Sequence, residues 1–233
     1  MSEVLPPAEE KAVSVRAMFD RIADRYDLLN RVLTGGSDLR WRRDVVRRLA
    51  IGPGDRLLDL AAGTGDFAAI ARSAGAEVVA LDFSRRMLEI GRARRRLDVH
   101  WVQGDALRLP FAEGAFTVVV SGFALRNFVE IPPVLREAAR VLAPGGRLGI
   151  LEVDEPESPV VRQLHRLYFQ RVVPLVGGWL SGDRIAYRYL PASAAYLPPT
   201  GELARWLREA GFRDPRRRRY MFGAIQAITA VRR

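Results

Sequence analysis

The chain has 233 residues and no cysteine, which excludes disulfide bonds, thiolate catalysis and cysteine metal sites. Its formal net charge is +10, and arginine carries almost all of the positive charge because Lys11 is the only lysine. No run of about 18 uninterrupted apolar residues could span a membrane, and the polar start lacks a signal-peptide core. We therefore expect a cytoplasmic protein with a single domain over 1–233.

Two arginine clusters, within 92–96 and 216–219, suit either nucleic acid or an anionic membrane surface. The aromatic residues do not alternate with these clusters as a base-stacking platform requires, so nucleic acid is not expected as a partner. A solvated arginine-rich surface is the other interpretation. The two histidines, His100 and His165, are too few for a histidine-rich centre, so no metal ion is expected.

The order of elements along the chain predicts an α/β sheet. Residues 1–11 are expected to be disordered, and helical patterns over 12–34 and 38–50 form an N-terminal cover, 12–50. Strands and helices then alternate. We expect strands at 56–61, 77–81, 99–103, 116–122 and 146–152, and helices at 66–74, 84–95 and 132–142. This alternation is typical of a doubly wound, Rossmann-like sheet with helices on both faces and right-handed crossovers.

The later part of the chain departs from this alternation. Ala143-Pro-Gly-Gly-Arg147 is expected to end the preceding helix and turn into the fifth strand. Residues 158–195 are expected to form an inserted helical cover, or substrate lid. Tyr220-Met-Phe-Gly and Ala224 to Arg232 are expected to add two strands as an antiparallel edge hairpin. The prediction is thus a mostly parallel sheet of seven strands.

The most informative segment is Leu57-Leu-Asp-Leu-Ala-Ala-Gly-Thr-Gly-Asp-Phe67, which combines a buried strand, a glycine turn and a helix start. Gly63 and Gly65 allow a sharp strand-to-helix turn and a close approach of a ligand to the backbone. Asp82 lies 17 residues after Gly65, at the end of the next apolar run. A carboxylate at this distance can accept hydrogen bonds from the ribose hydroxyls of an adenosine ligand.

The glycine turn leaves two cofactors open. Gly63-Thr-Gly-Asp-Phe-Ala68 also fits the dinucleotide fingerprint, which would indicate an NAD-dependent oxidoreductase. Asp59 places a carboxylate four residues before Gly63, which is unfavourable near a pyrophosphate but suits the cationic groups of S-adenosylmethionine. The alternative for Asp59 is a structural hydrogen bond within the turn.

Two further places follow strand ends. Asp105, in Gly104-Asp-Ala106, comes after a predicted strand and can accept a hydrogen bond from an adenine amino group. A turn or capping aspartate is the alternative, since Gly-Asp pairs are common in loops. Ser121-Gly122 ends the next strand. Together with the glycine turn and Asp82 these segments meet at the carboxyl ends of the strands, where open α/β sheets bind ligands.

Several longer segments resemble the menaquinone/ubiquinone-biosynthesis C-methyltransferases, which methylate a quinol ring with S-adenosylmethionine. The resemblance covers roughly 15–230 and rests on Phe19-Asp-Arg-Ile-Ala-Asp-Arg-Tyr-Asp-Leu-Leu-Asn30, Gly35-Gly, Arg40-Trp-Arg-Arg43, Leu58 to Asp66, Ser121-Gly-Phe-Ala-Leu-Arg-Asn-Phe128, Arg140 to Leu148, Ile150-Leu-Glu152 and Tyr187 to Ser193. Two departures are mild: Ala62 stands where cysteine or threonine is frequent, and Val153-Asp154 replace Phe-Ser. The resemblance implies a class I S-adenosylmethionine-dependent methyltransferase fold.

The resemblance also implies residue roles. Thr64, Asp82, the Asp105-Ala106 pair and Ser121 match cofactor-binding positions of the family. With the residues chosen on chemical grounds, the expected cofactor site comprises Asp59, Gly63, Thr64, Gly65, Asp82, Asp105, Ala106 and Ser121.

Methyl transfer from a sulfonium to carbon is an in-line displacement that needs alignment of the reactants and no metal. The acceptor ring becomes electron-rich when the quinol loses a hydroxyl proton. Arg126 and Asn127 follow the fourth strand, where arginine can stabilise a developing phenolate. A salt bridge that holds the loop is the alternative for Arg126. Tyr26 is expected either to hydrogen-bond the quinol or to serve as a half-buried core aromatic.

Two other titratable residues have weaker indications. Asp66 is expected to cap its helix. His165 lies in the inserted cover, where an exposed helix position is favoured over a role as base.

The sequence therefore predicts C-methylation of a prenylated quinol, with demethylmenaquinol as the leading substrate and the benzoquinol of ubiquinone biosynthesis left open. The alternatives are another small-molecule S-adenosylmethionine methyltransferase and a noncatalytic adenosylmethionine-binding subunit of a quinone-biosynthesis assembly. Val160 to Val176 has apolar residues at helical intervals with arginines between them, which suits peripheral contact with an anionic membrane at its inner face. A core helix is the other interpretation, and a homodimer is left open.

Overall fold

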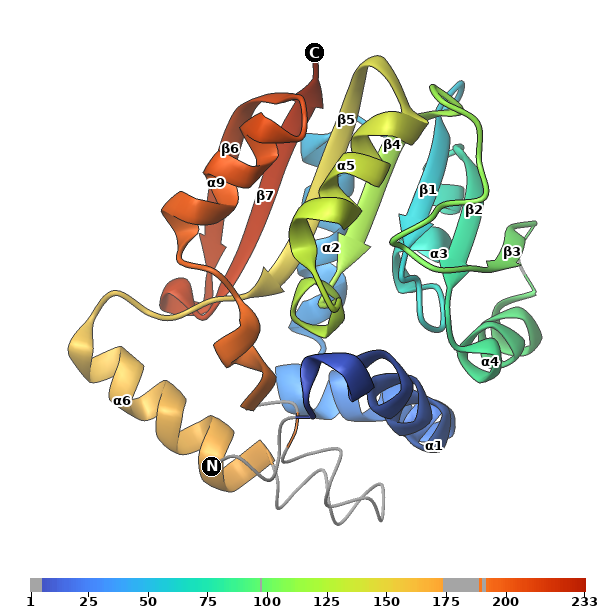
Figure 1. Cartoon of the computed structure of the whole chain (residues 1–233). Coiled ribbons are helices and arrows are strands. Elements are labelled where there is room, and N and C mark those ends of the chain that lie inside the picture. Colours follow the sequence, from blue (N-terminus) through green and yellow to red (C-terminus); the bar gives the residue numbers. More distant parts are fainter. Residues whose placement is uncertain (1–5, 97, 174–188, 190–191) are drawn as a thin grey trace.

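A computed structural model describes residues 6–96, 98–173, 189 and 192–233, and its centre is a seven-stranded sheet in the order β3-β2-β1-β4-β5-β7-β6 (Figure 1). The first five strands pair in parallel, whereas β7 is antiparallel to both β5 and β6. The strands are β1 (Arg56–Leu60), β2 (Glu77–Asp82), β3 (His100–Gln103), β4 (Phe116–Gly122), β5 (Leu142–Val153), β6 (Phe212–Tyr220) and β7 (Ile225–Arg232). This architecture confirms the predicted fold.

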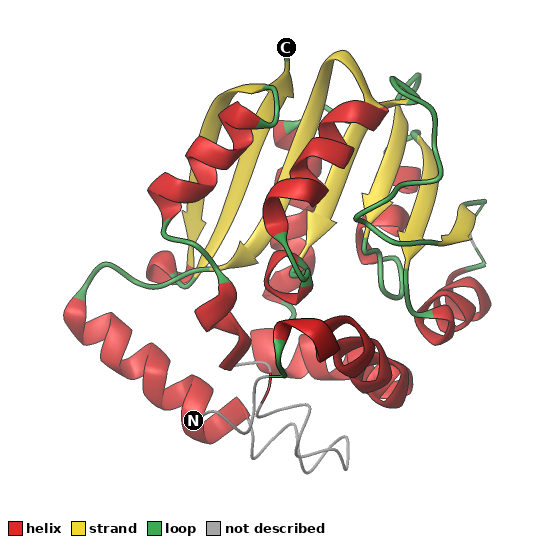
Figure 2. Ribbon diagram, viewed as in Figure 1, coloured by secondary structure: helices red, strands yellow, loops and turns green. Residues whose placement is uncertain are grey.

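Helices cover both faces of the sheet (Figure 2). They are α1 (Ala8–Thr34), α2 (Ser37–Arg48), α3 (Asp66–Ser73), α4 (Arg85–Arg95), α5 (Ile131–Val141), α6 (Pro159–Leu167) and α9 (Thr200–Glu209). Helices α5 and α9 pack on one face through residues such as Leu135 and Leu207. Helices α2 and α3 pack on the other through Val45 and Phe67. The central strands are apolar on both sides because both faces are covered.

Helix α1 lies across the carboxyl ends of the parallel strands, at the lower edge of the sheet in Figure 1. An acidic stripe holds it against the neighbouring turns. Ser84 Oγ donates to Asp20 Oδ1 at 2.5 Å, and Arg86 Nη2 donates to Asp24 at 3.0 Å. Thr64 Oγ1 donates to Asp27. The face of α1 that carries Asp20, Asp24 and Asp27 is therefore held against the turns that follow β1 and β2.

The structure corrects the prediction of a disordered lead over residues 8–11. Helix α1 begins at Ala8, earlier than the predicted residue 12. Lys11 is buried, and its ammonium donates to the carbonyl oxygen of Phe128 at 2.6 Å and lies 3.6 Å from the ring centroid of Tyr196. Burial lowers the pKa of Lys11 to about 8. Residues 1–5 lie outside the described part of the chain.

Two strand boundaries also differ from the prediction. Strand β5 begins at Leu142, so Ala143-Pro-Gly-Gly lies within it, at a register irregularity opposite Phe116–Val118 of β4. Strand β6 is Phe212–Tyr220 and carries the second arginine cluster, whereas Met221–Gly223 form the turn to β7. Four consecutive arginines, Arg216 to Arg219, give this edge strand little apolar signal, so the sequence prediction placed the strand too late.

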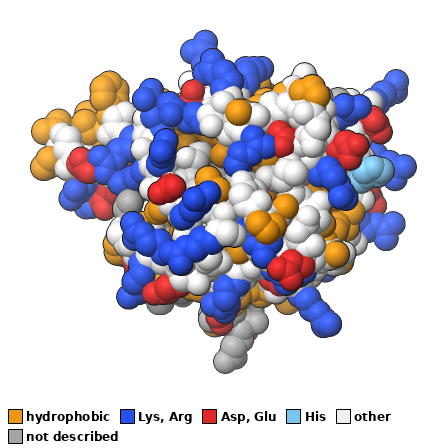
Figure 3. Space-filling model, turned by 90° about the horizontal axis from the view of Figure 1, so that it is seen from above, with side chains coloured by type: hydrophobic (Ala, Val, Ile, Leu, Met, Phe, Trp, Pro, Cys, Tyr) orange, Lys and Arg blue, Asp and Glu red, His pale blue; other side chains and the backbone are white. Residues whose placement is uncertain are grey.

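The inserted cover, 158–195, is helical where it is described: α6, a π-helical turn over Tyr168–Val172 and a 3-10 turn over Ser193–Tyr196. The remainder, 174–188 and 190–191, lies outside the described residues. None of the helices in the described ranges is long and apolar enough to cross a membrane. Arginine side chains are spread over the face seen from above in Figure 3, with acidic and apolar side chains between them.

Candidate functional site

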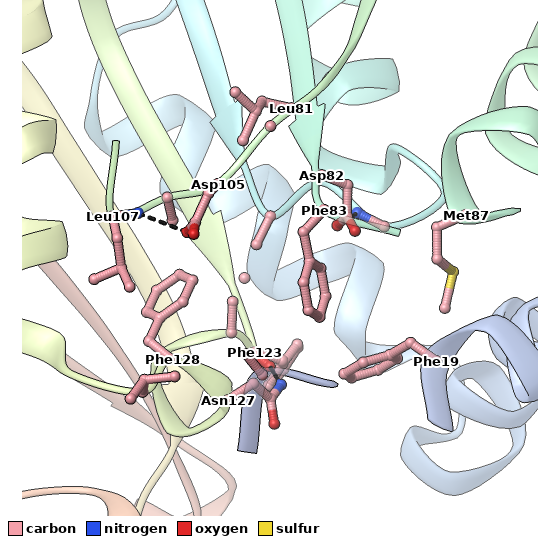
Figure 4. A pocket seen from close by; sticks show the side chains of 18 of the residues that line it. Phe19, Leu81, Asp82, Phe83, Met87, Asp105, Leu107, Phe123, Asn127 and Phe128 are labelled. Carbon is pink, nitrogen blue, oxygen red and sulfur yellow. Dashed lines mark hydrogen bonds between the residues drawn. The ribbon is translucent and has the colours of Figure 1, made fainter. Parts of the chain in front are cut away.

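A pocket lies at the carboxyl ends of the parallel strands, between the sheet and α1 (Figure 4). Its polar lining comes from the expected segments: Gly63 from the glycine turn, Asp82 from the end of β2, Asp105 from the loop after β3, and Asn127 from the 3-10 turn after β4 (Leu125–Asn127). Its apolar lining includes Ala61, Leu81, Met87, Ala106 and Leu107, with the aromatic residues Phe19, Tyr26, Phe83, Phe123 and Phe128.

The turn before α3 requires glycine for two different reasons. Gly63 and Gly65 both have positive φ angles, 57° and 81°. A Cβ atom at Gly65 would lie 2.5 Å from Cη2 of Trp101, which is far inside van der Waals contact. At Gly63 such an atom would lie 3.8 Å from Tyr26, so its requirement is conformational. Gly63 lines the pocket, and Gly65 leaves room for the Trp101 ring of β3 beside the start of α3.

Asp82 combines burial with a position in the pocket lining. Its Oδ2 atom accepts the backbone N–H of Gly63 and its Oδ1 atom accepts that of Ser84, each at 2.8 Å. Burial raises the pKa of Asp82 to about 6, although these N–H groups oppose the shift. The carboxylate thus ties the end of β2 to the glycine turn, and it retains lone pairs for a ligand.

Asp59 does not line the pocket. It is buried behind the turn, and its Oδ2 atom accepts the backbone N–H of Ala68 at 2.9 Å, in the first turns of α3. Burial raises its pKa to about 7. This geometry favours the structural alternative for Asp59 over the predicted cofactor contact. The sequence argument that used Asp59 to separate S-adenosylmethionine from a dinucleotide is therefore not supported.

The other predicted cofactor residues divide into two groups. Asp105 and Ala106 line the pocket, and Asp105 Oδ1 accepts the backbone N–H of Leu107 at 2.9 Å (Figure 4). Thr64 is buried, and its hydroxyl donates to Asp27 of α1. Ser121 is also buried, and its hydroxyl has no hydrogen-bond partner among the residues that the structure describes. Neither Thr64 nor Ser121 lines the pocket, and Gly122 does so instead.

The sequence predicted that Asp66 caps α3, and this prediction is wrong because Gly65 occupies the N-cap position. The Asp66 carboxylate instead joins two other helices. Oδ1 accepts from Arg31 of α1 at 2.6 Å and from Arg95 of α4 at 2.5 Å. Burial would raise the pKa of Asp66, but the charges of Arg42, Arg31 and Arg95 outweigh it and lower the pKa. The carboxylate therefore fastens α1 over the pocket.

Of the three predicted catalytic residues, Tyr26 and Asn127 line the pocket. The Tyr26 ring packs edge to face on Phe19, with centroids 5.9 Å apart. Burial raises the pKa of the Tyr26 hydroxyl, so it stays protonated at neutral pH. Asn127 Nδ2 donates to the carbonyl oxygen of Phe123 at 3.3 Å, and its Oδ1 accepts from the Tyr189 hydroxyl at 3.3 Å.

Arg126 is not among the residues that line the pocket. It is buried at the end of β4, and its guanidinium donates to Glu152, a fully buried carboxylate on β5. The ion pair matches the alternative that the sequence left open for this residue. Glu152 received no role from the sequence, although its place near the end of a buried strand indicated a carboxylate in need of a partner.

The aromatic lining was also missed. Phe83 and Phe123 directly follow the ends of β2 and β4, which is the position that Asp82 and Ser121–Gly122 made conspicuous in the sequence. Their position, one residue beyond the end of each strand, is the signal in the sequence that identifies both. His165, the weakest candidate, is half-buried on α6 outside the lining, and burial lowers its pKa.

Two solved structures that are titled SAM-dependent methyltransferases share this fold. A SAM-dependent methyltransferase from Thermotoga maritima superposes with a TM-score of 0.68 at 20% identity, covering 94% of this chain and all of that chain. One from Aquifex aeolicus gives a TM-score of 0.61 at 15% identity, covering 82% of this chain and 89% of that chain. These likenesses show the fold alone.

Sequence relatives are much closer. A demethylmenaquinone methyltransferase from Thermus thermophilus is 48% identical over 200 residues, 84% of this chain and 91% of the relative. One from Deinococcus radiodurans is 42% identical over 230 residues, 95% of each chain. A family model described as the ubiE/COQ5 methyltransferase family matches residues 7–232. The chain therefore belongs to the ubiE/COQ5 methyltransferase family.

Proposed function

We propose that this protein transfers a methyl group from S-adenosylmethionine to a ring carbon of a prenylated quinol, converting demethylmenaquinol to menaquinol. The observation that carries the proposal is the family match over residues 7–232, to which the pocket adds a chemical basis. The relatives from Thermus thermophilus and Deinococcus radiodurans are both named demethylmenaquinone methyltransferases, which favours a naphthoquinol over a benzoquinol.

The pocket residues fit S-adenosylmethionine. Each carboxylate oxygen of Asp82 accepts one backbone N–H, so each has a lone pair left for a ribose hydroxyl. Asp105 has the acceptors that an adenine amino group requires, and Phe83 offers an apolar surface between the two carboxylates and α1 (Figure 4). We assign Gly63, Asp82, Asp105 and Ala106 to direct contact with the cofactor, and Asp59, Thr64, Gly65 and Ser121 to support from below.

S-Adenosylmethionine supplies an electrophilic methyl group when it is bound, so the protein must orient an electron-rich ring against it. The aromatic residues that line the pocket exclude water and present flat surfaces to such a ring. Tyr26 and Phe19 come from α1, and Phe123 and Phe128 flank the 3-10 turn after β4. The acceptor ring would thus lie between α1 and this turn.

We assign hydrogen bonding of a quinol oxygen to Tyr26 and Asn127. Tyr26 keeps its proton at neutral pH and can therefore donate. Asn127 is oriented by Phe123 and Tyr189, which use one N–H and one oxygen lone pair of its amide, so the second N–H can donate to the quinol. Arg126 lies beside Asn127 in the chain but is turned toward Glu152. Its role in this proposal is electrostatic, since a guanidinium near the pocket favours the phenolate without touching it.

We also propose that the protein is cytoplasmic and meets its substrate at the inner face of the membrane, because a prenyl tail keeps the quinol in the bilayer. Helix α6 supports this: Val160, Leu164 and Leu167 are exposed along one stripe, and α6 contributes no buried residue. A core helix would bury that stripe. Sedimentation with anionic vesicles tests this contact, which should weaken with added salt. Sedimentation velocity tests for a homodimer.

The decisive experiment for the reaction uses methyl-labelled S-adenosylmethionine with demethylmenaquinol and, separately, the corresponding demethylated benzoquinol. We expect label in menaquinol, identified by mass spectrometry. Label only in the benzoquinol would reassign the substrate. Binding of the cofactor without label in either product would indicate a noncatalytic subunit or a different small-molecule acceptor, and would overturn the proposal.

A further inference from the structure

The turn between β6 and β7 presents two large apolar side chains to solvent. Phe222 is 88% exposed and Met221 is 55% exposed. Both have left-handed backbone conformations, with φ of 49° at Met221 and 55° at Phe222, and neither is glycine. Turns that need positive φ usually employ glycine or asparagine. Strained backbone of this kind clusters at functional sites, so the exposed pair calls for a functional explanation.

This turn lies beside the start of α6. A Cβ atom on Gly223 would be 3.4 Å from Cα of Pro156, and Arg219 forms an ion pair with Glu157. The backbone N–H of Asp154 donates to the carbonyl oxygen of Ala224 at 2.8 Å. The turn and the segment that leads into α6 are therefore in direct contact. Both lie at the carboxyl-end edge of β5, because Ile225 pairs with Val153 there.

Arginines lie beside these apolar groups, and two of them, Arg166 and Arg219, pair with the carboxylates of Glu155 and Glu157. Arg216 and Arg218 are exposed on β6, and Arg166 is exposed on α6. Apolar side chains flanked by arginines suit a bilayer with anionic headgroups, where the apolar groups enter the acyl boundary and the cations remain at the surface. A second copy of this chain fits less well, because β6 is the edge strand and two rows of its arginines would repel each other.

We propose that the turn Met221–Gly223 inserts Phe222 into an anionic membrane and acts with α6 as a two-point anchor. Two contacts at one edge of the sheet determine the orientation of the protein on the bilayer. A contact through α6 alone would let the protein rotate about the axis of that helix. The pocket edge then faces the membrane. This inference rests on the proposed function, because the anchor would serve to bring the enzyme to a quinol dissolved in the bilayer. Binding to vesicles can nevertheless be measured without any enzyme assay.

The absence of cysteine allows a direct test. Phe222→Cys is labelled with an environment-sensitive fluorophore, and Arg56→Cys, at the opposite end of the sheet, is the matched control. With vesicles of phosphatidylcholine and phosphatidylglycerol we expect a blue shift at 222 and none at 56. Vesicles of phosphatidylcholine alone should give a weaker shift. A label at 222 that stays in water while the protein binds vesicles would overturn the proposal.

Affinity gives a second measurement. Phe222→Ser should weaken binding to the anionic vesicles about tenfold or more, because it removes one large apolar group, while Phe222→Leu should bind nearly as the native protein does. Thermal melting of each variant verifies the fold. If the blue shift of the label at 222 increased with protein concentration and did not depend on lipid, the side chain would be covered by a second copy of this chain. That result would contradict the proposal.

Enzyme assays separate this inference from the proposed function. Phe222→Ser should raise KM for a long-chain quinol in vesicles and leave kcat on a short-chain, water-soluble quinol unchanged. If the native protein methylates neither quinol, the function fails while the vesicle measurements still decide the anchor. If methylation is normal and Phe222→Ser binds vesicles as the native protein does, only the anchor is wrong.

Discussion

Arg126 and Glu152 form an ion pair inside the protein, between the turn after β4 and the end of β5. Glu152 is fully buried and Arg126 is 7% exposed. Arg126 Nε and Glu152 Oε2 have no hydrogen-bond partner among the described residues. A buried pair with open hydrogen-bonding capacity contributes little net stability, but removing one partner leaves a buried charge. Glu152 therefore determines where the Arg126 guanidinium lies.

The first prediction separates the structural and electrostatic roles of this pair. Glu152→Ala should destabilise the fold by about 3–5 kcal/mol, because Arg126 would remain buried without a partner. The double variant Arg126→Met with Glu152→Leu should recover most of that loss, since apolar residues of similar volume replace both charges. Chemical denaturation measures both effects. In the refolded double variant we expect native cofactor affinity and greatly reduced turnover.

A double variant that methylates quinol at the native rate would show that Arg126 serves only the loop. Arg126→Lys should restore activity only partly, because an ammonium lacks the planar fork of the guanidinium.

The second prediction concerns cofactor affinity. Asp82→Ala should weaken S-adenosylmethionine binding about tenfold to a hundredfold, the effect of losing a charged hydrogen-bond acceptor. Because the pKa of Asp82 is raised to about 6, the carboxylate is ionised above that pH and protonated below it. Affinity of the native protein should therefore fall as the pH decreases through about 6, measured by calorimetry. In Asp82→Asn the affinity should no longer depend on pH in this range. In the control Asp98→Asn, at an exposed site, the pH dependence should be that of the native protein.

The third prediction tests the packing of the glycine turn. Gly65→Ala should destabilise the protein strongly, because its Cβ would lie 2.5 Å from the Trp101 ring and its φ of 81° disfavours a side chain. Gly54→Ala is the matched control, since Gly54 has φ of 87° but no atom within 4 Å of the added Cβ. The control should lose only about 1 kcal/mol. If the two variants lost the same stability in thermal unfolding, the contact between residue 65 and Trp101 would be unimportant, because the ring could move aside.

The fourth prediction follows from the raised pKa of Asp59, about 7 in the folded protein against an ordinary value of 3.8. Between these values the unfolded chain releases a proton that the native protein retains. The native protein should therefore lose stability relative to Asp59→Asn as pH rises from about 4 to about 7, by about 1.4 kcal/mol for each pH unit at most. Urea unfolding across this range measures the difference, and a constant difference would contradict the raised pKa.

The fifth prediction addresses Tyr26. Tyr26→Phe keeps the ring that lines the pocket and removes only the hydroxyl. If that hydroxyl donates to a quinol oxygen, kcat should fall about tenfold while cofactor affinity stays the same. Tyr220→Phe is the control, because its hydroxyl donates to Asp44 on α2, outside the pocket lining. Unchanged kcat in Tyr26→Phe would leave Tyr26 as a packing residue.

Sequence reasoning succeeded where structure follows from neighbouring residues. The alternation of apolar strands with helical segments predicted the sheet, and the glycine turn and Asp82 predicted the place of the pocket. It was less successful for β6, where Arg216 to Arg219 hide the strand because an edge strand needs little apolar character. It also placed the start of α1 too late, since Lys11 is buried by partners far along the chain, Phe128 and Tyr196.

The fold, the family and the edge of the sheet that holds the pocket follow from the sequence alone, because all three depend on local spacing and continuous motifs. The partner of each charged side chain is known only from the folded structure. Asp59 accepts from the α3 backbone, Asp66 binds arginines of α1 and α4, and Arg126 pairs with Glu152. A buried charge pairs with whichever opposite charge or N–H the packed elements bring within reach, and no local pattern specifies that choice.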